Sequence, residues 1–189
     1  MKEHKDIIFP KDFNIVALHL AYARSSLSKD MYKEGKSSYR GDKELLTSFK
    51  GLLCELIFRE FIKDRSPKET LEFSPLVEHV DIGDIALPDL KISNKTWDIK
   101  YGGANSLNVN TKSHANKRPD FYSFIRFINM TKCCIFTFKS QDIDKWNLID
   151  GNYGAPFFAK KMSSDGFISI EDEYLNKVKQ ELYQPSKGE

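Results

Sequence analysis

The sequence predicts an α/β fold, in which helices lie against a β-sheet, because helix-like and strand-like segments follow one another along the chain. From residue 42 to about residue 64, apolar side chains recur at helical spacing. After Pro67 the pattern changes to short runs rich in β-branched and aromatic residues, separated by Gly, Asn, Ser and Pro. The 189 residues, of which 40% are hydrophobic, suffice for a single domain with one core.

Three segments are expected to be helical. The first spans residues 13–27 and leads into a polar connection over residues 28–41. The second is the clearest, since Asp42 is placed to cap it and its apolar arc is wide enough to be buried on more than one side. Glu55 falls on the narrow polar strip of this helix. The third, IEDEYLNKVKQELY at residues 170–183, is expected to close the other face of the sheet.

Strand-like runs fill most of the sequence between the second and third helices. They are LEFSPLVEHV (71–80), DIALPDLKI (84–92), TWDIKYGG (96–103), DFYSFIRF (120–127) and KCCIFTF (132–138). The last two are apolar on both faces, which is typical of central strands that are covered on both sides.

The stretch PDLKISNKTWDIKYGG, which starts at Pro88, is expected to form a tight hairpin. If its turn is centred on residues 93–94, Asp89 lies opposite Asp98 across an antiparallel pair. The two side chains then share a face, with their Cβ atoms about 5 Å apart. The alternation of side chains along a strand puts Lys100 on the same face, one pleat beyond Asp98. Two carboxylates and an ammonium group therefore converge.

The other face of this strand is expected to point into a core through Trp97 and Ile99, so the polar face is kept polar beside apolar neighbours. Two carboxylates held this close repel each other and need a cation. Oxygen ligands favour Mg²⁺ or Mn²⁺ over zinc, and a lysine beside them can orient a metal-bound water. Geometry alone leaves two alternatives open. One is an ordinary exposed hairpin whose lysines offset the aspartate pair, and the other places Asp84 or Asp81 in the role of Asp89.

The basic residues of the chain gather in one region. The net charge is only +2, which does not indicate a nucleic-acid-binding protein. Between Lys91 and Arg118, however, six basic residues stand against one acid, Asp98, and a phosphate-facing surface needs this bias. The alternative is a solvated basic loop. The candidates for contacts with a nucleic-acid backbone are Lys112, Lys117 and Arg118, with Asn108, Asn110 and His114 as helpers.

Several function classes lack their motifs in this sequence. The histidines at positions 4, 19, 79 and 114 form no HxxxH or HNH arrangement, and no P-loop, GxGxxG or GxSxG stretch occurs. The three cysteines are expected to be small buried hydrophobes in a reducing compartment. Neither a signal peptide nor a membrane-spanning stretch is apparent, so we expect a cytoplasmic protein.

The order of these features resembles the PD-(D/E)xK nuclease superfamily, which includes restriction endonucleases, Holliday-junction resolvases and recombination exonucleases. The similarity covers roughly residues 48–138 and reads SFKGLLCELIFREF, then PDL, then WDIK, followed by two apolar strands. It implies a restriction-endonuclease-like fold, with a central mixed β-sheet flanked by helices. It also implies a single nuclease domain over residues 1–189, with a helical extension (1–41), a catalytic core (42–140) and a C-terminal segment (141–189).

The resemblance further implies a Mg²⁺-dependent deoxyribonuclease in which Mn²⁺ can substitute. Asp89 and Asp98 would bind the divalent cation with the backbone carbonyl of Ile99. Lys100 would position or help to deprotonate the attacking water and stabilise charge on the phosphate. Glu55 would contact the metal directly or through water.

The helix ligand departs from the family pattern and has a rival. Cys54 stands where many relatives have Gly just before the helix glutamate. Glu60 is a rival, because it is expected on the apolar side of the helix, where an unpaired charge would be costly. The alternative for Glu55 is a simple ion pair with Arg59, four residues along the helix.

The leading hypothesis is therefore a restriction-type or phage-encoded endonuclease that binds DNA and acts as a homodimer, so that two sites meet two strands. One alternative is a catalytically inactive nucleic-acid-binding or scaffold domain of the same fold. Another is a structure-selective resolvase of the Holliday-junction type.

Overall fold

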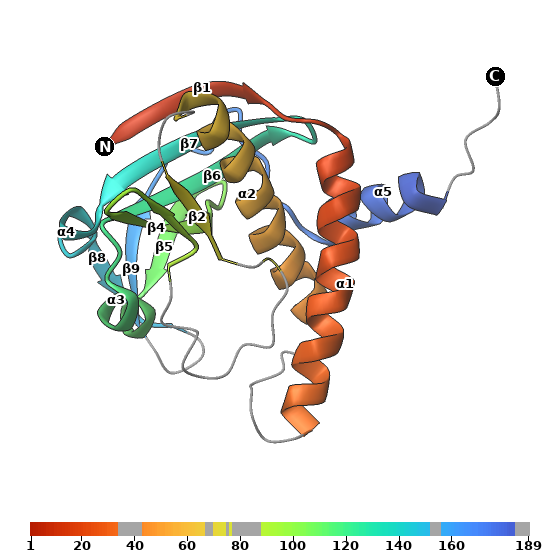
Figure 1. Ribbon diagram of the computed structural model, residues 1–189, viewed down its shortest axis with the longest axis horizontal. Coiled ribbons are helices and arrows are strands. Elements are labelled where there is room, and N and C mark those ends of the chain that lie inside the picture. Colours follow the sequence, from red (N-terminus) through yellow and green to blue (C-terminus); the bar gives the residue numbers. More distant parts are fainter. Residues whose placement is uncertain (34–42, 67–69, 75, 77–87, 152–155, 184–189) are drawn as a thin grey trace.

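The computed structural model contains a six-stranded mixed sheet with long helices against one face and a smaller sheet against the other (Figure 1). The residues that it describes are 1–33, 43–66, 70–74, 76, 88–151 and 156–183. The predicted α/β class, with a mixed sheet flanked by helices, is confirmed.

The large sheet has the strand order β1-β7-β6-β4-β3-β2. Its strands are β1 (Lys2–Ile8), β2 (Leu71–Phe73), β3 (Leu90–Ile92), β4 (Lys95–Tyr101), β6 (Phe121–Asn129) and β7 (Lys132–Lys139). Strands β4 and β6 are parallel, and the other neighbours are antiparallel. Strand β4, which carries Asp98 and Lys100, therefore lies inside the sheet, with its backbone paired on both sides.

Strands β6 and β7 confirm the prediction of central strands covered on both faces, because consecutive residues are buried over 122–127 in β6 and 133–136 in β7. Of the two earliest strand-like runs, residues 71–80 and 84–92, the described parts that form strands are β2 and β3. Residues 77–87 are outside the described part of the chain, and with them the alternative ligands Asp81 and Asp84.

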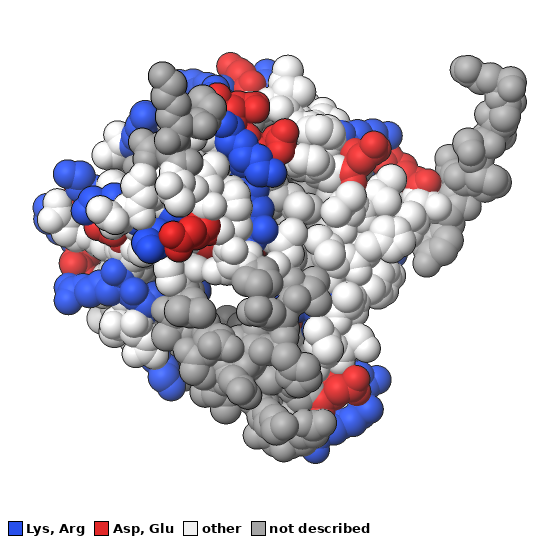
Figure 2. All heavy atoms as spheres, in the orientation of Figure 1, with Lys and Arg blue, Asp and Glu red and all other residues white. Residues whose placement is uncertain are grey.

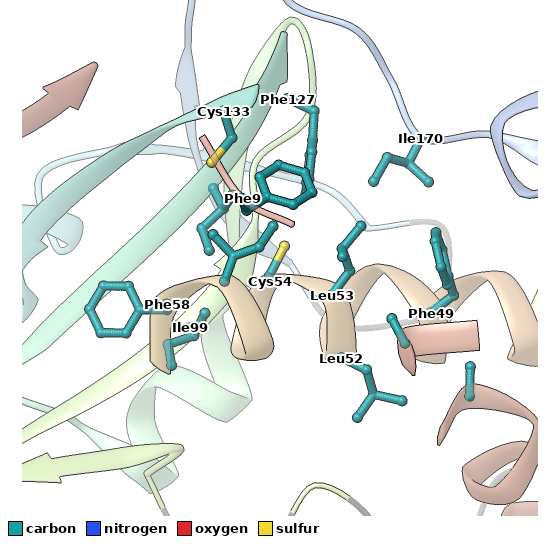
Figure 3. Packing of buried hydrophobic residues seen from close by; sticks show 14 of the residues in the cluster. Phe9, Phe49, Leu52, Leu53, Cys54, Phe58, Ile99, Phe127, Cys133 and Ile170 are labelled. Carbon is teal, nitrogen blue, oxygen red and sulfur yellow. The ribbon is translucent and has the colours of Figure 1, made fainter. Parts of the chain in front are cut away.

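Three helices, α1 (Asp12–Lys33), α2 (Lys43–Arg65) and α5 (Asp172–Tyr183), lie on one face of the large sheet. All three were predicted, although α1 continues past its expected end at residue 27 and the expected cap, Asp42, is outside the described residues. Helix α2 places its apolar arc, including Phe49 and Leu53, against the sheet residues Ile99 and Phe127 (Figure 3). This packing explains why the arc is so wide: α2 is covered by the sheet, by α1 and by α5.

The placement of α5 differs from the prediction. We expected it to close the opposite face of the sheet, but Tyr174, Leu175 and Val178 of α5 join the same core as α2. The Tyr174 hydroxyl donates a hydrogen bond of 2.6 Å to Asn14 of α1, which fixes the two helices together.

A second, three-stranded sheet covers the opposite face instead. Its order is β5-β9-β8, and its elements are β5 (Ser106–Asn110), β8 (Asn147–Ile149) and β9 (Phe157–Lys161), with short helices α3 (Thr111–Lys117) and α4 (Ser140–Ile143) beside it. Leu107 and Val109 of β5 pack on Tyr122 and Phe124 of β6 in a second core. The alternative of a solvated basic loop does not describe residues 106–110, which form β5, because Leu107 and Val109 are buried in this strand and β9 pairs with it.

A buried arginine ties the two sheets together. The Arg126 guanidinium donates hydrogen bonds to the carbonyls of Gly103, Ala104 and Ser163 and lies 3.7 Å from the centre of the Phe167 ring. The backbone of Gly102 passes so close that a Cβ there would lie 2.6 Å from Cγ of Arg126.

Two further expectations can be compared with the structure. Cys54, Cys133 and Cys134 are buried and form no disulfide, as predicted. Within the described ranges, no helix combines the length and the apolar character that a membrane crossing requires.

Candidate active site

The β3–β4 hairpin has the predicted register. Leu90 pairs with Trp97 and Ile92 with Lys95, so the position opposite Asp98 is that of Asp89. The turn is closed by Ser93 in a left-handed backbone conformation, with φ of 52°. The alternation of the strand sends Ile99 into the main core, as expected, and leaves Asp98 and Lys100 facing the other way.

The backbone holds Asp89 firmly although it lies just before β3. Its N–H donates to the carbonyl of Trp97 at 3.0 Å, and its own carbonyl accepts the N–H of Ser74 at 3.1 Å. Its side-chain Oδ2 accepts the N–H of Ile99 at 2.6 Å, in place of a further backbone hydrogen bond. The Ser74 hydroxyl donates to the carbonyl of Pro88 at 2.6 Å, which fastens this segment to the end of β2. The other oxygen of Asp89, Oδ1, is left for a cation.

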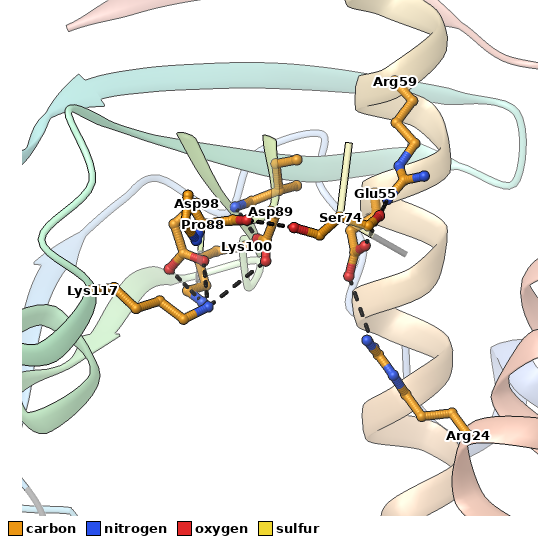
Figure 4. A network of polar contacts seen from close by, with 10 residues as sticks. Arg24, Glu55, Arg59, Ser74, Pro88, Asp89, Asp98, Lys100 and Lys117 are labelled. Atoms are coloured by element: carbon orange, nitrogen blue, oxygen red, sulfur yellow. Dashed lines mark hydrogen bonds and ion pairs between the residues drawn. The ribbon is translucent and has the colours of Figure 1, made fainter. Parts of the chain in front are cut away.

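Two lysines meet the aspartate pair (Figure 4). Asp98 is fully buried, and Lys100 Nζ lies 2.6 Å from its Oδ2. Lys117 Nζ lies 3.1 Å from Asp98 Oδ1 and 3.7 Å from Asp89 Oδ1, so it bridges the two carboxylates. Lys117 was predicted to contact a nucleic-acid backbone, whereas the structure places it inside the site.

Helix α3 explains how Lys117 reaches this position. Asn110 ends β5, and its side-chain oxygen accepts the N–H of Ser113 at 3.0 Å, which caps the start of the helix. The helix ends at Arg118, whose backbone is left-handed with φ of 37°. Lys117 is therefore the last helical residue before the chain enters β6, which is paired with β4 beside Asp98.

Glu55 approaches the site from α2 and is buried, with an exposed fraction of 8%. Its carboxylate lies 3.8 Å from Nη1 of Arg24 on α1 and 3.6 Å from Nη2 of Arg59. Figure 4 shows the glutamate on the side of α2 that faces the hairpin. Burial raises the pKa of Glu55, although the two arginines and Lys100 counteract part of this effect.

The rival residue Glu60 lies elsewhere. It was expected on the apolar side of the helix, but its side chain is exposed. It lines a hollow of about 230 Å³ with Asp6, Phe9, Asp64 and Arg65, between α2 and β1. That prediction was wrong because Glu60 stands near the C-terminal end of α2 beside this hollow, so its side chain reaches solvent although it shares a helix face with the buried Phe49 and Leu53.

The two aspartates have opposite pKa shifts. Burial, together with the negative charges of Asp98 and Glu55, raises the pKa of Asp89 to about 8. Burial also favours the neutral form of Asp98, but the charges of Lys100 and Lys117 outweigh it and lower the pKa of Asp98. At neutral pH the metal-free pair therefore carries one shared negative charge, placed mainly on Asp98.

Lys100 is expected to be a charged ammonium group. Burial alone would lower the pKa of Lys100, but Asp98 and Asp89 raise it above its ordinary value. A lysine in this state donates hydrogen bonds and stabilises negative charge, and it is a poor proton acceptor.

The donor set suits a hard divalent cation. Asp98 Oδ2 is buried and has the Lys100 ammonium group 2.6 Å away, while Asp98 Oδ1 faces Oδ1 of Asp89 across the Lys117 ammonium group. The remaining donors are carboxylate oxygens, which Mg²⁺ and Mn²⁺ prefer. Among the described residues, no three acidic, histidine or cysteine side chains gather tightly enough to hold a metal as they stand, since Glu55 is turned toward its arginines. The geometry thus offers two carboxylates, Asp89 and Asp98, to a common cation.

The other residues predicted to contact nucleic acid differ in how far their side chains are available to a ligand. Lys112 is exposed on α3, and Arg118 is 70% exposed, with one nitrogen 3.7 Å from Asp144. Asn110 uses its oxygen to cap α3. On the face shown in Figure 2, basic and acidic side chains of the described residues are interspersed, in keeping with the small net charge.

Asn108 and His114, which were expected to assist these contacts, also differ in exposure. Asn108 is exposed on β5. His114 is buried between the Tyr122 hydroxyl and Asp144, each 2.9 Å from a ring nitrogen, so its role is in packing α3 against the sheet.

The sequence did not indicate that Lys117 and Arg24 lie beside the acids. Lys117 is predicted as a contact with a nucleic-acid backbone, and no role is predicted for Arg24. No local pattern marks either residue, because each reaches the site through tertiary packing. Asn110, in contrast, carried a usable signal, since Asn followed by Thr and Ser is a typical helix start.

Comparisons with known proteins give no family for this chain. No protein-family model matches it, and neither the curated proteins nor the solved structures gave a match.

Proposed function

We propose that this protein is a divalent-cation-dependent endonuclease that hydrolyses phosphodiester bonds of DNA, with a restriction-endonuclease-like fold of the PD-(D/E)xK type. The observation that carries the proposal is the convergence of Asp89, Asp98 and Lys100 at one end of the β3–β4 hairpin, with the buried Glu55 facing them from α2. The buried carboxylates of Asp98 and Glu55 are costly to maintain beside the partly buried Lys100, and such groups cluster at sites that carry out chemistry.

The arrangement of elements around the site supports the same proposal. A helix with a buried glutamate precedes the hairpin, and the second hairpin strand runs inside a mixed sheet, parallel to β6. The elements around the site therefore follow the order that the proposed fold requires: a helix, a hairpin and then two buried strands.

In this proposal Asp89 and Asp98 hold Mg²⁺, with Mn²⁺ as a substitute, and Glu55 acts directly or through water once its arginines release it. The bound cation supplies a water of lowered pKa and neutralises charge on the scissile phosphate. Lys100, held as an ammonium group by the aspartates, orients the attacking water and stabilises charge on the phosphate rather than accepting a proton. The carbonyl of Ile99 remains a proposed ligand, and the Ile99 N–H fixes the Asp89 side chain in position.

DNA would approach over α3, where Lys112 and Arg118 are exposed beside the site. Arg24 of α1 keeps 30% of its side chain exposed and lies on the other side of the acids, so it offers a further phosphate contact. A restriction-type or phage-encoded enzyme acting as a homodimer is consistent with one site per chain and two strands per duplex.

One observation favours a second candidate function, a catalytically inactive nucleic-acid-binding domain of the same fold. The acids of the site already have cationic neighbours, since Asp98 is flanked by Lys100 and Lys117 and Glu55 by Arg24 and Arg59. A site balanced in this way is stable without a metal.

The experiment that separates the two is a cleavage assay on supercoiled plasmid with Mg²⁺ or Mn²⁺. Wild type is expected to nick or linearise the plasmid, while Asp98→Asn and Lys100→Met lose the activity. The exposed residues Asp150 and Lys145 supply matched controls, Asp150→Asn and Lys145→Met, which should cleave normally. Melting curves of all variants exclude misfolding as the cause.

The alternative outcomes are equally definite. Retained DNA binding with no cleavage by wild type would establish the inactive binding domain. Cleavage of branched but not linear DNA would identify a structure-selective resolvase, and cleavage of RNA alone would contradict the proposed substrate.

A further inference from the structure

We propose that Lys117 is a built-in cation that occupies the position of the divalent metal between Asp89 and Asp98 and is displaced when the metal binds. This inference rests on the proposed function, because it concerns how the same site is loaded. It makes Lys117 a positioning residue that controls access of the metal, and it is separate from the role of Lys100.

The contacts of the two lysines differ in kind. Lys100 belongs to β4 and approaches Asp98 Oδ2, so it stands beside the pair. Lys117 approaches Oδ1 of both aspartates, at 3.1 Å and 3.7 Å, so it stands between them. These are the oxygens through which one cation can bridge the two carboxylates, because the other oxygen of Asp89 is taken by the N–H of Ile99. A metal and the Lys117 ammonium group cannot both use them.

The charges of the site lead to the same conclusion. Three carboxylates, Glu55, Asp89 and Asp98, are surrounded by four cationic groups on the side chains of Arg24, Arg59, Lys100 and Lys117. Adding a divalent cation while all four remain would leave a large excess of positive charge in a buried region, which is unfavourable. Withdrawal of one lysine reduces that excess.

Lys117 is placed to withdraw by its position at the end of a short helix. It is the last residue of α3, directly before the left-handed Arg118, and 12% of its side chain is exposed. Lys100 is more exposed, at 29%, but it stands on β4 inside the sheet. A lysine has a flexible four-carbon stem and can swing its ammonium group without moving the backbone. The displaced ammonium would join Lys112 and Arg118 as a phosphate contact, so metal loading and DNA binding would reinforce each other.

The first test is metal affinity without DNA. Mn²⁺ binding is measured by titration calorimetry or electron paramagnetic resonance for wild type, Lys117→Met and the exposed control Lys145→Met. In wild type, only molecules whose Lys117 has left the aspartates can bind the metal. If they make up about one tenth of the protein, removing Lys117 should tighten Mn²⁺ binding roughly tenfold. Lys117→Met should also melt at a lower temperature than wild type in chelator and gain more stability from Mn²⁺.

The second test distinguishes displacement from simple charge repulsion. Lysine acylation followed by mass spectrometry is carried out on wild type with and without Mg²⁺. Lys117 should become several-fold more reactive when Mg²⁺ is present, because its ammonium group leaves the carboxylates, while the exposed Lys145 serves as an internal reference that does not change.

Each outcome decides the matter. Tighter metal binding by Lys117→Met together with increased labelling of Lys117 supports the proposal. Tighter binding without increased labelling overturns displacement, and unchanged affinity with a wild-type protein that binds metal overturns the proposal while leaving the nuclease function standing. Absence of metal binding in both proteins would overturn the proposed function itself.

Discussion

Replacing Asp89 by asparagine should remove a pH dependence from the stability of the metal-free protein. The folded protein holds the proton of Asp89 up to a pKa of about 8, whereas an unfolded chain releases it near the ordinary value of 3.8. Between these values the folded state binds more protons than the unfolded state, so stability must fall as pH rises. Asparagine resembles the protonated carboxyl group and keeps an oxygen for the N–H of Ile99, but it does not titrate.

The size of the effect follows from the two pKa values. One proton contributes about 1.4 kcal/mol per pH unit, so wild type is expected to lose roughly 4 kcal/mol of unfolding free energy between about pH 5 and pH 8. Because 20% of the Asp89 side chain is exposed, water screens part of its charge and this figure is a ceiling. For a protein of this length that ceiling corresponds to a fall of about 8–16 °C in Tm.

The assay is thermal melting in chelator at constant ionic strength, across this pH range, for wild type, Asp89→Asn and the exposed control Asp150→Asn. The lowered pKa of Asp98 does not mask the result, because its contribution is present above 3.8 and is lost only as pH falls below that value. Wild type and Asp150→Asn should lose Tm as pH rises, and Asp89→Asn should lose much less. Parallel curves for all three proteins would refute the reasoning.

Two further predictions concern the junction between the sheets. Arg126→Met keeps the apolar volume but leaves three backbone carbonyls without their donor, and it should lower the unfolding free energy in urea by about 3 kcal/mol. If the unfolding free energy falls no more than in the exposed control Lys145→Met, water must be donating to these carbonyls in place of the guanidinium. Gly102→Ala should cost about 1–3 kcal/mol, because its Cβ would lie 2.6 Å from Arg126 Cγ and 3.0 Å from Leu107 Cδ2. Gly51→Ala, in the middle of α2 with its nearest neighbour at 3.9 Å, should instead stabilise by about 0.5–1 kcal/mol, and equal effects of the two substitutions would contradict this account.

The hairpin could be predicted from sequence because its geometry is local. A short turn fixes which residues are opposite, and alternation then fixes which face they share, so Asp89, Asp98 and Lys100 follow from the position of the turn alone. The choice of Glu55 came from the resemblance to the nuclease motif, whereas helical periodicity named Glu60 as its rival. Periodicity places Glu60 on the apolar side of α2, but it does not indicate where along the helix that side ceases to be covered.

The rest of the site depends on contacts between distant segments. Strand β5 looks polar along the sequence, and the burial of its Leu107 and Val109 depends on a small sheet in which it pairs with β9, about fifty residues later. That pairing sets the start of α3 and so brings Lys117 to Asp98. Arg24 reaches Glu55 through the packing of α1 on α2. The acids of this site and Lys100 were therefore predictable from the sequence, whereas the positions of Lys117 and Arg24 were not.

The central claim is that Asp89 and Asp98 together bind a divalent cation, and a crystal soaked in Mn²⁺ tests it most directly. The anomalous difference map should show a manganese peak in contact with carboxylate oxygens of both aspartates, with the Lys117 ammonium group moved away from them. Absence of a peak at this position, with Lys117 still bridging the carboxylates, would contradict the account.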